Sequence, residues 1–364
     1  MDDMLERFPY LENHKQLRHI TEARVGAHHG GQFPAWKLVV ETMMKKGHLD
    51  AVFATSTVAA GVNFPARTVV MFNSDRFNGS EFVSLNATEF HQMTGRAGRR
   101  GIDKIGFMLV FPGKFMDVRH VKKLSFQKAE KITSRLRNDF SMVLNLLLSH
   151  RPSEVRDIFD RSLAEFQIEK RGGVGKHTLW RDFNKHLSFL TSEGFVTKGG
   201  ILTDEGAWTS QLRLDQPLLI AECLRHDDFP DDEALLAAVV APFVSDSDQD
   251  IHVPRGMIPE PLRHAFRRVF RRVAAISKRM KRAGFATTAL SVWPSVALYN
   301  WATGSQWEEI TGALKVADGD LAMLILRTAD NLRQIASLRD SHPRMAERAR
   351  EARENILREP VVFE

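Results

Sequence analysis

The 364-residue sequence predicts an α/β lobe with a parallel, incomplete β-sheet, followed by a mainly α winged-helix-like region and a helical bundle. Short apolar runs of strand type alternate with helical patterns as far as Phe111. Such alternation is typical of a parallel sheet with helices on its faces. After Pro112, strand patterns nearly vanish while helical periodicity continues to the end of the chain. The chain is also long for one core, so we expect about two or three domains.

The elements of the lobe follow from local patterns. A first helix begins at Pro34 and carries apolar residues at helical spacing, among them Trp36 and Val40, with Gly47 just past its end. A second helix is predicted over residues 87–97. Strands are predicted at residues 50–55, 68–72 and 106–111, since each is a short apolar run of the kind found in buried strands.

The helical part contains one extended pair. Residues 135–148 predict an amphipathic helix, and Leu179, Phe183 and Leu190 lie on the apolar face of another. The runs 195–197 and 201–203 then flank a Lys-Gly-Gly turn, and a helix is predicted to start at the N-cap Asp204. A helix, a short hairpin and a new helix are compatible with a winged-helix wing. The last clear helix runs from Asp320 and carries one apolar stripe: Leu321, Leu324, Ile325, Thr328, Leu332 and Ile335.

One predicted helix near residues 263–282 is crowded with arginine and lysine. Such a face can track a phosphate backbone, and it can equally be a solvated helix surface. The sequence leaves both readings open. Its buried stripe is predicted to be Phe266, Val269, Phe270, Val273 and Met280.

Composition bounds the function only loosely. The content is 43% hydrophobic and 26% charged, which is ordinary for a globular protein. A net charge of +6 favours a polyanionic partner. No apolar run approaches the ~20 residues that span a bilayer, so no membrane partner is expected. The single cysteine, Cys223, excludes an internal disulfide framework and favours a cytoplasmic location.

The most informative segment is residues 90–101, which read Q-x-x-G-R-x-G-R from Gln92 to Arg99. The spacing lets the guanidinium groups of Arg96 and Arg99 reach one side of a nucleotide cleft. Arginine suits this task because its planar fork stays charged and binds phosphate oxygens bidentately. An arginine on a transferring phosphate is worth roughly 10³–10⁵ in rate. The alternative is a helix with solvated arginines.

A second segment, residues 54–65, directly follows a predicted strand. Its hydroxyl side chains at Thr55, Ser56 and Thr57 can bond an anionic backbone. Gly61 allows close approach of the main chain to a ligand, and Asn63 adds a donor and an acceptor. The alternative is a Ser/Thr-rich helix cap.

Together these two segments resemble motifs V and VI of superfamily 2 DExH-box helicases, in the second RecA-like lobe. More narrowly, they are similar to the superkiller and exosome-associated RNA helicase branch, with its A-T-x-T-x-A-x-G-x-N-x-P-A and Q-M-x-G-R-A-G-R-R-G patterns. Residues 25–31 resemble the H-H-x-G segment of that branch. Residues 139–147 and 162–167 are similar to its motifs after the second lobe. The C-terminal part of the chain resembles the helical (DSHCT) domain of that branch at Trp301, Gly304, Trp307, Gly319, Asp320 and residues 330–335.

The resemblance implies a role for each residue. Arg99 would be the arginine finger on the ATP γ-phosphate, Arg96 a second phosphate contact, and Gln92 would orient the nucleotide or the attacking water. Gly61 and Asn63 would link the nucleic-acid strand to the ATP cleft. The nucleic-acid contacts would be Thr55, Ser56, Thr57, His28 and His29. For the two histidines the alternative is a strand-end pair without ligand, and no metal site is predicted because no His/Cys cluster stands at ligand spacing.

The sequence also departs from the family. It contains no G-x-x-x-x-G-K-[ST] and no DExH box, the elements that cradle phosphates and hold magnesium. ATP and Mg²⁺ would therefore be bound mainly by a missing N-terminal RecA-like lobe, and the second lobe is expected to be truncated at its N-terminus. Alone, this chain is predicted to be inactive.

We therefore predict three regions: a second RecA-like lobe at 1–115, a winged-helix-like connector at 116–175, and a DSHCT-like helical domain at 176–364. The leading hypothesis is the C-terminal part of an ATP-dependent helicase that unwinds or translocates on single-stranded RNA. The pair Arg99-Arg100 favours RNA. The alternatives are a DNA helicase of the same superfamily and a non-catalytic nucleic-acid-binding module.

Overall fold

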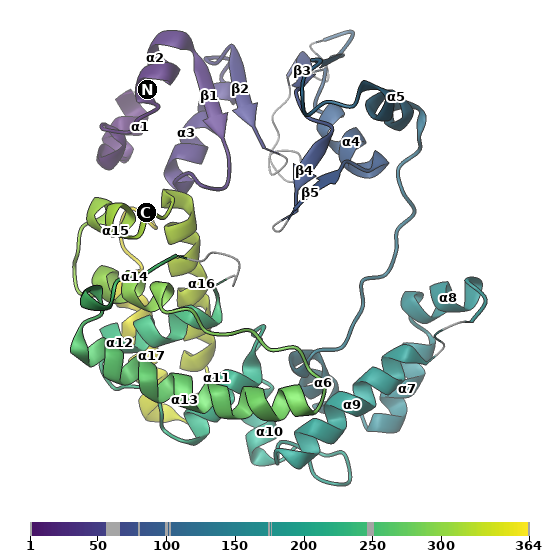
Figure 1. The fold of residues 1–364 in the computed structure, drawn as a ribbon, viewed down its shortest axis with the longest axis vertical. Helices are drawn as coiled ribbons and strands as arrows, with labels where there is room; N and C mark the ends of the chain where they lie inside the picture. Colours follow the sequence, from purple (N-terminus) through teal and green to yellow (C-terminus); the bar gives the residue numbers. More distant parts are fainter. Residues whose placement is uncertain are drawn as a thin grey trace. The chain divides into compact units, whose positions relative to one another are not determined.

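A computed structural model of the chain describes residues 2–55, 66–78, 81–98, 101, 103–173, 175, 177–245 and 251–362 (Figure 1). The chain divides into two compact units. The first comprises Met1–Ile132 together with Ala317–Ala322 and Glu359–Glu364, and the second comprises Thr133–Val316 and Met323–Arg358. The prediction of an α/β lobe followed by a mainly α region is confirmed.

Parallel strand pairing defines the first unit. Strand β1 (Val25–His28) pairs in parallel with β2 (Ala51–Ala54), and helix α3 (Pro34–Lys45) connects them. Strand β3 (Thr68–Met71) pairs in parallel with β6 (Phe107–Val110). The predicted helix at Pro34 and the three predicted strands are confirmed within one or two residues at each end.

An antiparallel hairpin of β4 (Asp75–Phe77) and β5 (Phe82–Ser84) was not predicted. The remaining helices of this unit are α1 (Asp2–Arg7), η1 (Pro9–Leu11), α2 (Leu17–Ala23), α4 (Ala87–Thr94) and α5 (Val118–Phe126). Figure 1 shows α4 and α5 beside β3. One face of the β3–β6 pair packs on them, through Met71 of β3, Phe90 of α4, and Val121 and Leu124 of α5.

Helices dominate the second unit. The first of them are α6 (Phe140–Leu147), α7 (Pro152–Asp160), α8 (Leu163–Lys170), α9 (Thr178–Ser192) and α10 (Asp204–Thr209). They are followed by α11 (Pro217–Arg225), α12 (Glu233–Val240), η3 (Ala241–Phe243), η4 (Arg255–Met257) and α13 (Glu260–Arg282). The last are α14 (Trp293–Ala302), α15 (Trp307–Leu314), α16 (Asp318–Ala336), whose first residues as far as Ala322 belong to the first unit, and α17 (Pro343–Ile356).

The helix predicted at 135–148 is wrong over its first residues. Helix α6 begins only after Asp139, whose side chain accepts a hydrogen bond from the Met142 amide at 2.7 Å and so caps the helix. Before it, the Asn138 side chain donates to the carbonyl of Leu179 at 2.8 Å. This tertiary bond and the cap hold the preceding backbone out of the helix.

The predicted turn between residues 195 and 203 is present. Val196 and Leu202 form an antiparallel bridge, and the Thr197 amide donates to the carbonyl of Ile201 at 2.8 Å. The predicted N-cap Asp204 is wrong by one residue. Thr203 caps α10 instead, because its hydroxyl accepts from the Gly206 amide at 3.1 Å. Among the described helices, none combines the length and the apolar character needed to cross a membrane.

Candidate nucleotide and nucleic-acid interface

Helix α4 carries the start of the arginine motif and is fixed at its N-terminus. The Asn86 side chain accepts from the Glu89 amide at 2.9 Å, and the Glu89 carboxylate accepts from the Asn86 amide at 3.0 Å. The same carboxylate accepts from Nε of Arg76 at 2.5 Å. With Phe90 buried against the core, the helix presents Gln92 on its exposed face. The predicted helix over 87–97 was too long, because α4 ends at Thr94.

After α4, the arginine motif continues as a turn at residues 96–98, which pairs with the backbone of Ala66. Ala66, which directly follows the Thr55–Pro65 segment, forms a parallel bridge with Ala97. The Ala66 amide donates to the Arg96 carbonyl at 3.1 Å, and the Gly98 amide donates to the Ala66 carbonyl at 2.8 Å. Main-chain bonds therefore hold the arginine turn against Ala66.

Two glycines make this crossing possible. A Cβ on Gly106 would lie 2.6 Å from the backbone of Ala97 and Gly98, closer than real Cβ atoms come. Gly98 has a φ of 88°, in the left-handed region that favours glycine. The entry to β6 and the arginine turn thus touch backbone to backbone.

Five predicted site residues lie outside the described residues: Ser56, Thr57, Gly61, Asn63 and Arg99. Of the others, the structure brings Thr55 next to the histidine segment, since the Thr55 amide donates to the carbonyl of His28 at 3.3 Å. Gln92 lies in the last turn of α4, and Arg96 follows the C-cap residue Gly95. The predicted roles of all these residues remain predictions.

The two histidines occupy different environments. His28 is buried, and its Nε2 lies 3.2 Å from Oε1 of Glu41 on α3, which gives the ring a protein partner. His29 is half-buried, and burial together with the positive charge of Lys15 lowers its pKa. The ring of His29 therefore stays neutral at neutral pH and can accept or donate one hydrogen bond.

A supporting network behind the histidine loop was missed from sequence. The Gln16 side-chain oxygen accepts from Gln32 at 2.6 Å and from Nε1 of Trp36 at 3.2 Å. His14 stacks on Trp36 with ring centroids 3.7 Å apart, and burial lowers the pKa of His14 to about 4. No spacing pattern links these residues, since the contacts form only after α3 has docked.

Gly319, at the start of α16, closes the same loop. A Cβ at this position would lie 2.0 Å from the carbonyl oxygen of Gly30, so any larger residue would push the start of α16 and the loop at Gly30 apart. The Gly319 amide donates to the carbonyl of Gly31 at 3.2 Å. The glycine noted in the sequence thus has a packing reason.

One group of side chains has atoms close enough to share a metal ion. Asp160, Glu165 and His177 each offer a ligand atom, all within 4.8 Å of one another. Nδ1 of His177 lies 3.4 Å from Oδ1 of Asp160, and the His177 amide donates to Glu165 at 2.7 Å. These contacts account for the grouping without an ion, and the prediction of no metal remains a prediction.

Comparison with known families identifies two domains. The family described as helicase conserved C-terminal domain matches residues 2–101. The family described as DSHCT (NUC185) domain matches residues 199–364.

Curated relatives share this part of their sequences with the chain. Superkiller complex protein 2 of Mus musculus is 33% identical over 208 residues, which cover 56% of this chain and 17% of that protein. Exosome RNA helicase MTR4 of Homo sapiens is 37% identical over 169 residues, which cover 46% of the chain and 16% of the relative. Probable helicase HelY of Mycobacterium tuberculosis is 36% identical over 146 residues, which cover 40% of this chain and 16% of that protein. The chain spans less than a fifth of the length of these relatives.

Proposed function

We propose that this chain, which belongs to the superfamily 2 DExH helicases, is the C-terminal part of an ATP-dependent helicase that unwinds or translocates on RNA. The proposal rests on the order of the two matched domains and on the names of relatives, among which exosome RNA helicase MTR4 names RNA. A cytoplasmic location is part of the proposal.

One structural observation carries it. The turn that holds Arg96 is bonded through its main chain to Ala66, at the end of the segment predicted to contact nucleic acid. A displacement of the arginine turn would therefore be transmitted to Ala66. Such rigid coupling is what an enzyme needs if nucleotide contacts are to move a bound strand.

In this proposal, Arg99 and Arg96 place positive charge on the ATP phosphates, while Gln92 orients the nucleotide or the attacking water. Bound Mg²⁺ would neutralise charge on the phosphate oxygens, and with ATP it would be held mainly by the N-terminal RecA-like lobe. Exposed Gln92 and the arginine-bearing turn fit an anionic ligand, because they offer amide and guanidinium donors.

The strand-binding side would use Thr55, Ser56 and Thr57, with His28 and His29 nearby. Hydroxyl and amide donors to phosphate position a strand without reading its sequence. We propose the boundaries 1–115, 116–175 and 176–364 for the RecA-like lobe, the winged-helix-like connector and the DSHCT-like domain.

The test is ATP hydrolysis by the purified chain, alone and with a separately expressed N-terminal lobe, with and without single-stranded RNA. We expect no turnover by the chain alone and RNA-stimulated turnover with the added lobe, lost in Arg99→Ala. RNA-stimulated turnover by the chain alone would contradict the missing-lobe reading. If the reconstituted pair binds RNA but never hydrolyses ATP, the non-catalytic binding module becomes the better interpretation. Stronger binding to a matched single-stranded DNA would favour the DNA helicase.

A further inference from the structure

We propose that the exposed basic face of α13, with the pocket beside its C-terminal half, binds single-stranded RNA separately from the helicase motifs. This inference rests on the proposed function, since it assigns a second contact for the same strand.

The charge of α13 is one-sided. After Glu260 the helix contains no acidic residue, while arginine and lysine recur along its whole length. Helix α17 is a contrast within the same chain, because two of its arginines are paired with carboxylates of the same helix. There, Arg350 lies 2.6 Å from Glu347 and 2.7 Å from Glu354, and Arg348 lies 2.7 Å from Glu351. A solvated helix face needs no excess of one charge, so α13 calls for another explanation.

Three of the arginines on α13 have structural partners. Arg272 lies 2.6 Å from Asp228, and Arg268 donates from Nε to the carbonyl of Asp228 at 2.9 Å. Arg279 reaches Glu193 at 2.9 Å and Glu222 at 3.0 Å. These side chains hold α13 against its neighbours and are not available to a ligand. Part of the basic helix is therefore structural.

The other cations form an exposed stripe. Arg267, Arg271, Lys278 and Arg282 follow one another at intervals of four, seven and four residues, which places them on one helix face, and Lys281 lies next to them. No acidic side chain pairs with any of the five among the residues that the structure describes. At 1.5 Å rise per residue the stripe extends over about 22 Å. It is long enough to follow several phosphates of a single strand.

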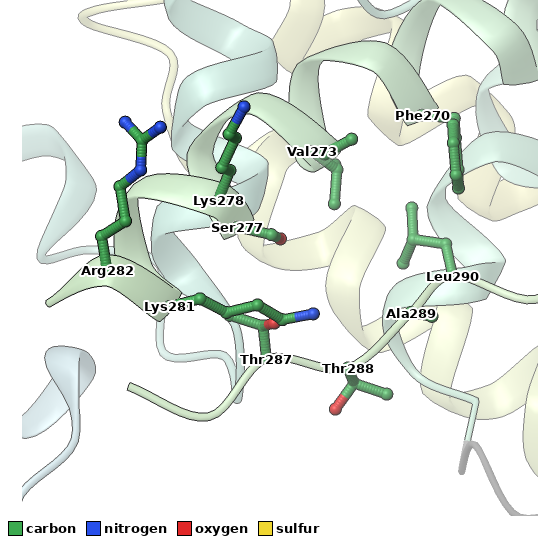
Figure 2. A pocket seen from close by; sticks show the side chains of 11 residues that line it. Phe270, Val273, Ser277, Lys278, Lys281, Arg282, Thr287, Thr288, Ala289 and Leu290 are labelled. Carbon is green, nitrogen blue, oxygen red and sulfur yellow. The ribbon is translucent and has the colours of Figure 1, made fainter. Parts of the chain in front are cut away.

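A pocket of about 540 Å³ opens beside the C-terminal half of the stripe, between α13 and the segment 287–290. Val273 and Leu290 supply apolar walls, and Thr287 and Thr288 supply hydroxyl groups. Figure 2 shows Ser277 and Lys281 pointing into this space, whereas Arg282 points away. The Ser277 hydroxyl is buried and has no hydrogen-bond partner within the protein. The pocket thus offers an ammonium and hydroxyl donors next to an apolar wall.

An aromatic face completes the surface. Phe270, at the rim of the pocket, is 44% exposed and stacks on Phe266 with ring centroids 6.0 Å apart and planes 23° apart. The prediction that Phe270 belongs to the buried stripe is wrong; Leu262, Val269, Val273, Ile276 and Met280 form that stripe. An exposed ring beside unpaired cations is the combination that single-stranded nucleic acid uses, with bases on the ring and phosphates on the cations. An acidic peptide would need the cations but not the ring.

The experiment measures the anisotropy of a fluorescent single-stranded RNA with the full chain across a series of salt concentrations. The variant K278Q/K281Q/R282Q removes three cations that line the pocket. The control R213Q/K315Q/R339Q removes the same charge from exposed positions elsewhere in the second unit. Each phosphate contact contributes about 0.7 to the magnitude of the slope of log binding constant against log salt concentration. The pocket variant should therefore lower that magnitude by about 2. The control should leave the slope unchanged.

A second variant separates stacking from charge. Phe270→Ala should weaken binding roughly five- to a hundredfold through the loss of one stacked base, with an unchanged salt slope. Its exposed ring makes little contribution to folding, so the variant remains interpretable.

If the unaltered chain binds RNA and the pocket variant behaves like the control, the α13 site is overturned while the proposed function stands. If the unaltered chain does not bind RNA, the α13 site is overturned, while the proposed function is decided by the RNA-stimulated ATPase of the chain with the added N-terminal lobe. A poly-glutamate peptide that displaces RNA equally from the unaltered chain and from Phe270→Ala would instead assign the surface to an acidic partner and overturn the RNA site.

Discussion

The contact between Gly106 and the arginine turn leads to a sharp prediction for Gly106→Ala. The added methyl group would lie 2.6 Å from the carbonyl carbon and oxygen of Ala97 and from the nitrogen of Gly98. Because the neighbours are main-chain atoms, no side-chain rotation relieves the clash. The arginine turn must move away from β6.

The magnitude follows from two costs. Overpacking of a tight site costs about 1–3 kcal/mol. The shift also strains the two bonds between Ala66 and the turn, at 3.1 and 2.8 Å, each worth about 1 kcal/mol. We expect the free energy of unfolding of the first unit to fall by about 2–4 kcal/mol. The RNA-stimulated ATPase of the reconstituted enzyme should fall as well, since the turn that holds Arg96 is displaced.

Urea unfolding followed by circular dichroism gives the stability, and hydrogen exchange at the Gly98 amide reports the local bond to Ala66. Gly113→Ala is the matched control, because a Cβ there meets nothing within 4 Å. The control should leave both the free energy of unfolding and the exchange rate of the Gly98 amide unchanged. Equal midpoints and equal exchange rates for the two variants would refute the close backbone crossing.

Two further predictions concern partly buried groups. His14 titrates near pH 4 in the folded chain against about 6.5 when unfolded, so its contribution is present above pH 6.5 and is lost as the pH falls towards 4. His14→Phe, which keeps a ring over Trp36, should therefore lose less stability between pH 7 and pH 5 than the unaltered chain or the exposed control His19→Phe; urea midpoints at both values measure this, and identical losses would contradict it. Arg279→Ala should lower the free energy of unfolding by about 1–3 kcal/mol, because Glu193 and the nearly buried Glu222 lose a charged donor. Arg282→Ala, one turn away and exposed, should change it by no more than about 0.5 kcal/mol, and equal effects in urea unfolding would show that the Arg279 pairs contribute nothing.

Local sequence patterns predicted the elements that are held by local forces. Strands β2, β3 and β6 are apolar runs between polar turns, and α3 has a proline at its start and a glycine after its end. The β4–β5 hairpin was overlooked although Asn78-Gly79 is a strong turn signal. The start of α6 was wrong because the hydrogen bond from Asn138 to Leu179 is tertiary and leaves no trace in the periodicity.

For the candidate site, the roles of the predicted residues remain predictions. Residue types and spacing singled out Gln92, Arg96 and the hydroxyl-rich segment, because binding of phosphate groups requires particular donor side chains at particular spacings. The main-chain bonds between Ala66 and the arginine turn could not be foreseen, because backbone pairing carries no side-chain signature. For α13, the sequence left open which cations are solvated. Only the partners of Arg268, Arg272 and Arg279 separate the structural charges from the exposed ones.

The contact of Gly319 with the loop at Gly30 has a consequence for synthesis of the protein. The first compact unit includes Ala317–Ala322 and Glu359–Glu364, so its last pieces leave the ribosome long after Ile132. At about 5–20 residues per second, that delay is roughly ten to fifty seconds. During this interval the nascent chain holds the Gly30–Gly31 turn without its cover, while the helices encoded in between can already assemble. The lobe that bears the arginine motif is thus expected to mature after the second unit, although it precedes most of that unit in the sequence.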